Sequence, residues 1–133
     1  MEHHKHDKLY NLIQFSDFIS FAVSLNCIIN GEDTIIDGTN YNSSNYGLIF
    51  ANTADESKIS YFKFFNFRST ILFVKSLIKF SVSHCSFFSN KIDSGYGMIL
   101  SSHGSFKIRD CHFYDNYFNG ANCFEAYTSQ IYI

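Results

Sequence analysis

Residues 80–90 recur 26 residues further along the chain as residues 106–116. The two copies read FSVSHCSFFSN and FKIRDCHFYDN, and five positions match in the same order and direction. The ten matched residues are Phe80, Val82, Cys85, Phe87 and Asn90 with Phe106, Ile108, Cys111, Phe113 and Asn116. A repeat of this length is one supersecondary unit, which buries its apolar face against neighbouring copies. Because the copies run in the same direction, stacking like on like predicts parallel coils in which these ten residues form structural ladders.

Length and composition restrict the classes of protein that this chain can belong to. A chain of 133 residues predicts one domain, and its hydrophobic content of 46% with 19% aromatic residues is not that of a disordered chain. The formal net charge is −2, and the arginines are Arg68 and Arg109. No basic run is available to neutralise a series of phosphates, so the sequence predicts no nucleic-acid partner.

The four cysteines, Cys27, Cys85, Cys111 and Cys123, are sparse for a disulfide framework, and no CxxC pair indicates zinc. Cys85 and Cys111 hold equivalent repeat positions among apolar neighbours, which predicts that each is a small buried hydrophobe. Stacked parallel strands lie about 4.8 Å apart, which is within the Cα separation that a disulfide can span. A bond between Cys85 and Cys111 therefore stays open.

The N-terminal third differs from the repeats. Apolar spacing over residues 8–18 permits a short amphipathic helix, which would cap the solenoid, and alternation over residues 19–27 predicts a strand. Asn30-Gly31 predicts a turn. We therefore expect an N-terminal tail and cap over residues 1–33 and coils over residues 34–133. Polar residues interrupt the apolar stretch 9–29, so we expect no transmembrane span and find no clear signal peptide.

Each predicted coil contains two apolar segments, and the chain holds about four such coils. The first segments contain Leu48 and Phe50, Leu72 and Val74, Met98 and Leu100, and Phe124 and Ala126. The second segments contain Ile59 and Tyr61, Phe80 and Val82, Phe106 and Ile108, and Ile131 and Ile133. Phe64 follows in the place of Cys85 and Cys111. Asn66 then falls in the place of Phe87 and Phe113, and Phe67 comes one residue later, which predicts a bulge there.

Two FxxN motifs, Phe87-Phe-Ser-Asn90 and Phe113-Tyr-Asp-Asn116, stand at this fixed spacing. Gly-apolar segments precede coils at Gly47-Leu-Ile-Phe50 and Gly97-Met-Ile-Leu100. With these motifs the sequence resembles the right-handed parallel β-helix repeats of the polymorphic outer-membrane-protein and adhesin class, in the pectate-lyase-like superfamily. The resemblance implies an all-β solenoid at the cell surface or outside the cell. It also implies binding of glycans or cell-surface proteins.

The same fold hosts polysaccharide lyases and glycoside hydrolases, so fold alone does not decide between binding and catalysis. The best catalytic candidates are Arg109 and Asp110 with Asp115, and Asp37 beside its glycine. One coil earlier, Arg109, Asp110 and Asp115 align with Ser83, His84 and Ser89, so no acidic ladder forms. We interpret these charges as outer-face and turn residues, and we expect no catalytic, metal-binding or cofactor-binding residues.

The sequence thus predicts a non-catalytic, adhesin-type repeat module that binds glycan or protein. A polysaccharide lyase or glycoside hydrolase is the alternative. Because residues 131–133 end within a strand segment and no polar capping repeat follows, we also expect a fragment of a longer protein or association through that end. An antiparallel β-sandwich, with Asn30-Gly31 as a hairpin turn, is the rival fold.

Overall fold

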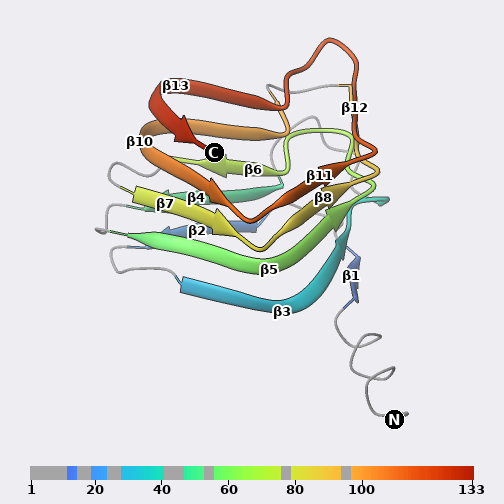
Figure 1. Cartoon of the computed structure of the whole chain (residues 1–133), viewed down its shortest axis with the longest axis horizontal. Coiled ribbons are helices and arrows are strands. Elements are labelled where there is room, and N and C mark those ends of the chain that lie inside the picture. The colour runs from blue at the N-terminus through green and yellow to red at the C-terminus, as the bar shows by residue number, and fades with distance from the viewer. Residues whose placement is uncertain are drawn as a thin grey trace.

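The computed structural model describes residues 12–14, 19–23, 28–40, 47–52, 56–75, 79–93 and 97–133. These residues form a parallel β-solenoid of about three turns, and they include no helix (Figure 1). The predicted all-β solenoid is confirmed. Its turn number is lower than the expected four because the outermost described strands do not complete a coil: β13 (Phe124–Tyr132) continues only the faces formed by β10 (Ile99–Arg109).

The remaining described strands follow the chain in coil order. They are β1 (Leu12–Gln14), β2 (Ile19–Val23), β3 (Ile28–Asp37), β4 (Leu48–Asn52), β5 (Ser57–Phe65), β6 (Leu72–Val74), β7 (Lys79–Ser83), β8 (Ser86–Phe88), β9 (Lys91–Ile92), β11 (His112–Tyr114) and β12 (Tyr117–Phe118).

The strands stack in three main faces around the core. The first face contains β2, β4, β6 and the first halves of β10 and β13. The second contains the first halves of β3 and β5, then β7 and the second halves of β10 and β13. The third contains β1, the second halves of β3 and β5, then β8 and β11. Every strand pair of the described part is parallel, which excludes the antiparallel sandwich.

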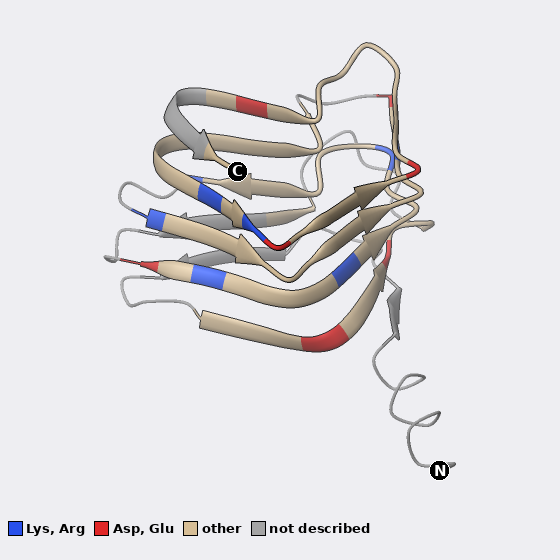
Figure 2. Cartoon of the chain, in the orientation of Figure 1, with Lys and Arg blue, Asp and Glu red and all other residues tan. Residues whose placement is uncertain are grey.

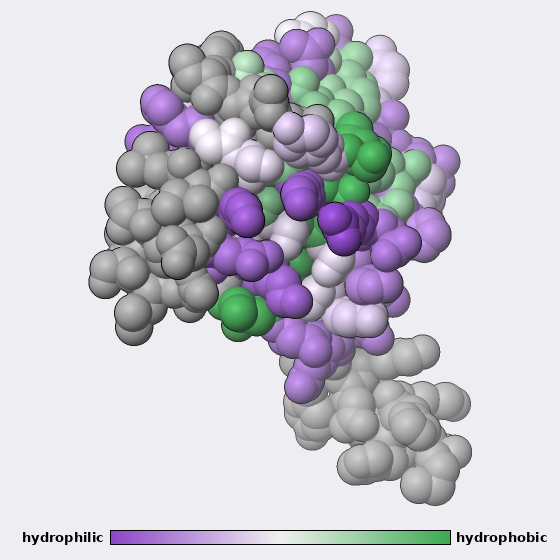
Figure 3. Space-filling model, turned by 60° about the vertical axis from the view of Figure 1, so that its left-hand side comes forward, coloured by the Kyte–Doolittle hydropathy of each residue, from purple (hydrophilic) through white to green (hydrophobic). Residues whose placement is uncertain are grey.

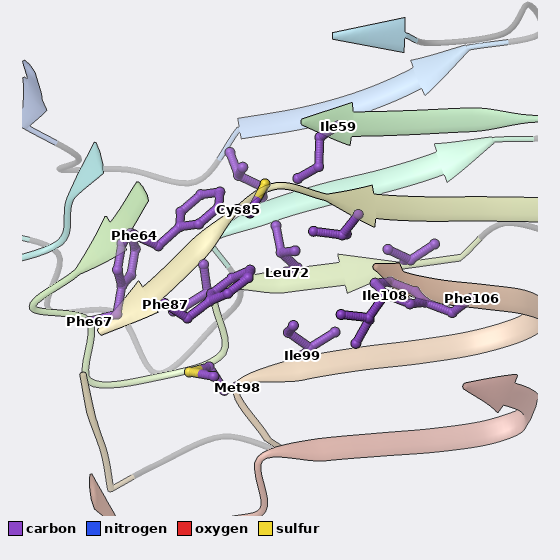
Figure 4. Close-up of a cluster of buried hydrophobic side chains, with 14 of the residues drawn as sticks. Ile59, Phe64, Phe67, Leu72, Cys85, Phe87, Met98, Ile99, Phe106 and Ile108 are labelled. Carbon is purple, nitrogen blue, oxygen red and sulfur yellow. The ribbon is translucent and has the colours of Figure 1, made fainter. Parts of the chain in front are cut away.

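The core lies between the faces, and aromatic rings of successive coils stack within it (Figure 4). The ring of Phe87 lies between those of Phe64 and Phe113, at centroid distances of 4.9 and 5.0 Å. On the second face Phe80 packs on Phe106 at 5.6 Å. Stacked parallel strands repeat at nearly this spacing, so one phenylalanine in each coil fills the interior as a continuous column.

In three successive coils, two corners use left-handed backbone at residues other than glycine. Between the second and third faces, Tyr61, His84 and Asp110 have φ of 58°, 51° and 52°. After the third face, Asn66, Ser89 and Asp115 repeat the same bend, with φ of 61°, 53° and 54°. Such angles are uncommon outside glycine and cost free energy. Their recurrence at equivalent positions shows that the bend is a constant of the coil, although the residue is not.

An asparagine completes each FxxN motif, and it is buried in the first motif and half-buried in the second. Asn90 is 1% exposed, and its Oδ1 accepts the backbone N–H of Phe67 at 2.9 Å. Its Nδ2 donates to the carbonyl of Phe64 at 3.3 Å. Asn116 repeats the arrangement, donating to the carbonyl of Phe87 at 2.8 Å and accepting the N–H of Asn90 at 3.2 Å. Each asparagine therefore satisfies backbone groups of the coil before its own.

The structure corrects two of the predicted registers. In the first face Leu72 opposes Ile99, so Met98 and Leu100 are each one residue out of the expected ladder. In the second face Ile59 opposes Val82, so the expected pairing of Ile59 with Phe80 is wrong by two residues. Ser57 occupies the position opposite Phe80.

The predicted bulge in the third face is also wrong. Phe64 directly opposes Phe87, and Phe67 lies at the place of Asn90 without any shift in register. The irregularity lies instead in β3, where the pairing shifts between Asn30 and Thr34. The turn predicted at Asn30-Gly31 would end a strand. In the structure these two residues instead lie within the bulged strand β3.

The segment expected as a capping helix contains β1, whose Leu12 opposes Ile35 in a parallel pair. The rest of residues 8–18 lies outside the described part, as do residues 24–27 of the predicted strand that follows. Within the described residues, no helix is long and apolar enough to cross a membrane.

Candidate functional site

Lysines and serines cover the outer side of the second face, where alternate residues of β5, β7 and β10 point away from the core. Three ladders run across the strands: Lys58, Ser81 and Lys107; Ser60, Ser83 and Arg109; and Lys79 with Ser105. The intervening residues Ile59, Phe80, Val82, Phe106 and Ile108 are buried. We call these eight outward residues the lysine–serine face.

The charge of this face opposes that of the whole chain. The chain carries −2, yet four of its ten lysines and arginines lie here: Lys58, Lys79, Lys107 and Arg109. Figure 2 shows these cations gathered along β5, β7 and the second half of β10. Among the described residues that line the face, Glu56 is the acidic one. The fold thus gathers into one surface cations that are dispersed in the sequence.

Two shallow hollows lie on the lysine–serine face. One has a volume of about 530 Å³ and lies toward β13, where Tyr132 and Ile133 complete its wall. The other, of about 250 Å³, extends toward Glu56 and Lys58. Lys107 and Arg109 line both, so the two hollows adjoin at the centre of the face. Figure 3 shows hydrophilic side chains gathered on this side of the molecule.

An aromatic stripe follows the outer side of the third face. Phe65 stacks on Phe88 at 5.4 Å, and Phe88 stacks on Tyr114 at 5.1 Å with planes only 3° apart. Rings that stack on one another leave their edges to solvent, whereas stacking on a sugar needs a free ring face. The stripe therefore stabilises the sheet. Phe65 and Tyr114 are its two end rings, and Tyr114 is 48% exposed.

The corner between these two faces carries a small polar cluster. Tyr61 stacks on the imidazole of His84 at 4.8 Å with planes 7° apart. Nε2 of His84 lies 3.8 Å from Oδ2 of Asp110, and the two side chains are 45% and 72% exposed. A contact this exposed contributes little to stability, and it is an ion pair only when His84 is protonated. The cluster marks the boundary of the lysine–serine face.

The structure separates the predicted catalytic candidates. Arg109 lies on the second face, Asp110 at the first corner and Asp115 at the second corner, with β11 between the two aspartates. Asp37 lies at the end of β3, where its carboxylate accepts hydrogen bonds from Thr39 and Asn66. Burial alone would raise the pKa of Asp37, but these hydrogen bonds outweigh burial and lower it. Asp37 holds a turn, as its glycine neighbour predicted.

Cys85 and Cys111 lie on neighbouring coils, each immediately after the first corner. Cys85 is fully buried and Cys111 is half-buried. The two neighbouring thiols affect each other's ionisation, so Cys85 lowers the pKa of Cys111 and Cys111 raises that of Cys85. At Cys123, burial raises the pKa to about 11.

Among the described residues, no group of three or more histidine, cysteine or acidic side chains could hold a metal ion. Comparison of the chain with protein-family models, curated proteins and solved structures finds no match in any of the three. Sequence reasoning did not single out Lys58, Lys79 or Lys107. Their alternation with buried residues was the available signal, because alternate residues of a strand share one side.

Proposed function

We propose that this chain is a non-catalytic binding module of adhesin type whose lysine–serine face binds an anionic glycan. The observation that carries the proposal is the gathering of Lys58, Lys79, Lys107 and Arg109 on one sheet of an acidic chain. The resemblance to adhesin-type β-helix repeats supports the same reading. The resemblance indicates a glycan as the ligand, and the positive charge of the face indicates that this glycan is anionic.

The spacing of the cations suits a polymer. Lys58 and Lys107 lie on one ladder with Ser81 between them, so their Cα atoms are about 10 Å apart at the usual strand spacing. Long lysine side chains can reach carboxylates or sulfates on either side of that line. The serines are short, so a sugar chain can approach the sheet and exchange hydrogen bonds with their hydroxyls.

The openness of the face favours an extended ligand over a small molecule. Small-molecule sites are concave and bury most of the ligand. Here the two hollows are shallow and meet at Lys107 and Arg109. A chain lying across both would contact all four cations, and the sum of several weak ionic contacts gives salt-dependent affinity.

The alternative, cleavage of a polysaccharide, requires acidic groups on the face. Glycoside hydrolases use two carboxylates that flank the scissile bond, at about 5–9.5 Å from each other. Among the described residues that line the two hollows, Glu56 carries a carboxylate and lies at the edge. The arrangement supports binding over hydrolysis.

The test is binding of the 133-residue chain to heparin and polygalacturonate, measured by calorimetry at two salt concentrations. The double variant Lys107→Glu/Arg109→Glu removes the centre of the face. Lys63→Glu/Lys91→Glu makes the same charge change on other strands and serves as the control. We expect the first variant to lose affinity by about ten-fold or more, equivalent to ~1.4 kcal/mol, and the control to lose less than about three-fold.

Four results would contradict the proposal. Equal losses in both double variants would show that net charge decides binding, without a defined face. If the chain also binds neutral glycans, and if high salt leaves that binding unchanged, an ionic site is excluded. Release of unsaturated or reducing sugar ends from polygalacturonate would favour the enzymatic alternative, and tighter binding to single-stranded DNA than to either glycan would identify a nucleic-acid site.

A further inference from the structure

Cys85 and Cys111 have the same local geometry one coil apart. Sγ of Cys85 lies 3.4 Å from the carbonyl oxygen of Ser83, and Sγ of Cys111 lies 3.3 Å from that of Arg109, in each case two residues earlier. Sγ of Cys111 also lies 3.6 Å from the carbonyl oxygen of Val82, which belongs to the coil of Cys85. The Cys111 sulfur therefore reaches toward the preceding coil.

The backbone holds the two residues in neighbouring positions. The N–H of His112 donates to the carbonyl of Cys85 at 2.9 Å, and Ser86 opposes His112 in the third face. Stacked parallel residues are about 4.8 Å apart, which lies within the Cα range of disulfides. Both thiols are free in this structure. Closing a bond between them requires side-chain rotation without a change of register.

We propose that Cys85 and Cys111 form a thiol-modification site, at which a small disulfide such as oxidised glutathione converts the two thiols into a bond between adjacent coils. This proposal is independent of glycan binding. It concerns the corner beside the lysine–serine face, and either proposal can fail without the other.

The two thiols have unequal roles. Cys111 is half-buried, so a small disulfide can reach it, whereas Cys85 is fully buried. The thiolate is the reactive form, and the neighbouring Cys85 lowers the pKa of Cys111. Burial, and more weakly the charge of Asp110, oppose this effect without cancelling it. Cys111 is thus the attacking thiol and Cys85 the resolving thiol.

The reaction balances in two exchanges. The Cys111 thiolate attacks one sulfur of the small disulfide, forms a mixed disulfide and releases one thiolate. Cys85 then attacks the Cys111 sulfur, the second small thiolate leaves, and the proton of Cys85 passes to that leaving thiolate. Two protein thiols are oxidised by two electrons in total, and one small disulfide is reduced to two thiols.

The test uses the Cys27→Ser/Cys123→Ser chain, which retains only this pair, incubated folded with oxidised glutathione at neutral pH. Peptide mapping should recover a peptide joined at Cys85 and Cys111, and the chain mass should fall by two hydrogens. The melting temperature should rise by about 4 °C or more, because the bond closes a loop of about 26 residues in the unfolded chain. Reduction should reverse both changes.

Two further variants keep the result interpretable. Cys111→Ser, at the half-buried position, should remain folded and leave Cys85 unmodified by glutathione. Cys85→Ala, if its circular dichroism matches the parent, should stop at a lasting mixed disulfide on Cys111. A lasting mixed disulfide in the parent pair, a disulfide-linked dimer, or no reaction of Cys111 would each overturn the proposal.

Discussion

Nδ2 of Asn90 lies 3.0 Å from Oδ1 of Asn116, its counterpart one coil further along the solenoid. The same Oδ1 accepts the backbone N–H of Asn90, so Asn116 binds both the side chain and the main chain of its predecessor. Asn90 in turn binds the backbone of the coil before it, at Phe64 and Phe67. The asparagines thus link three coils through one chain of hydrogen bonds.

Replacing Asn90 with alanine should lower the free energy of unfolding by about 2–4 kcal/mol, because it leaves two buried backbone groups, Phe64 C=O and Phe67 N–H, without this partner. Urea denaturation measures the change. Asn122→Ala is the control, since Asn122 is exposed and bonds to Glu125, and we expect a loss within about 0.5 kcal/mol. Equal effects at the two positions would refute the role given to Asn90.

The phenylalanine column predicts a second difference. Phe87 is fully buried between two stacked rings, so Phe87→Ala should cost about 3–5 kcal/mol through lost burial and the remaining cavity. Tyr114→Ala removes a half-exposed ring that stacks only on Phe88 within the described stripe, and it should cost about 1 kcal/mol. Thermal and urea unfolding of both variants compare the phenylalanine column of the core with the aromatic stripe of the third face. A larger loss for Tyr114→Ala would contradict this account of the core.

Gly38 and Gly120 are required for different reasons: at Gly38 a larger side chain would clash, and at Gly120 it would strain the backbone. A Cβ at Gly38 would lie 2.6 Å from the ring of Phe67, which is 1% exposed and cannot easily move, so Gly38→Ala should cost about 1–3 kcal/mol. Gly120 has φ of 70° and open space around it, so Gly120→Ala should cost about 1 kcal/mol through backbone strain alone. Gly120→Ser should lower the free energy of unfolding by the same amount as Gly120→Ala. If serine at Gly120 is much worse than alanine, space and not strain limits that position.

Asp37 gives the stability a pH dependence whose sign follows from its lowered pKa. Burial opposes ionisation, but the hydrogen bonds from Thr39 and Asn66 outweigh it. Because the folded pKa lies below the unfolded value of about 3.9, the unfolded state binds more protons in this range. The contribution is therefore complete above about pH 5 and is lost as the pH falls through 3.9 toward the folded pKa.

The Asp37→Asn variant should show a shallower fall in the free energy of unfolding between about pH 5 and pH 3 than the parent chain. The hydrogen bond from Arg68 also lowers the pKa of Asp93, and that contribution is common to both proteins. The difference between the two curves thus isolates Asp37. Parallel curves would show that its hydrogen bonds persist equally well in the unfolded chain.

The repeat correctly predicted the strand pairing where the apolar residues of two coils could be aligned in only one way. Phe80 opposes Phe106, Val82 opposes Ile108 and Phe87 opposes Phe113, as the two aligned copies require. The prediction failed where several registers were equally apolar. Residues 98–101 are all buried, so the sequence there does not alternate between apolar and polar residues and does not show which side chains face inward. The phenylalanines at positions 62, 64, 65 and 67 could be aligned with the later coils in more than one way.

The lysine–serine face was harder to predict for another reason. Its cations come from three strands and occupy three different ladders, and each ladder also contains serine, so no ladder is basic throughout. Only the correct register of β5 on β7 brings Lys58 into line with Lys107, and that register was the one misjudged by two residues. A charge pattern of this kind needs the fold before it can be recognised.

The strand order also has a mechanical consequence. Each described strand pairs only with the strands of the coil before and the coil after it. A force that pulls an end coil away along the solenoid axis therefore loads one interface at a time, and the coils should detach in sequence at low force. A force across the axis loads many backbone hydrogen bonds together, so this protein should resist stretching much more strongly in one direction than in the other.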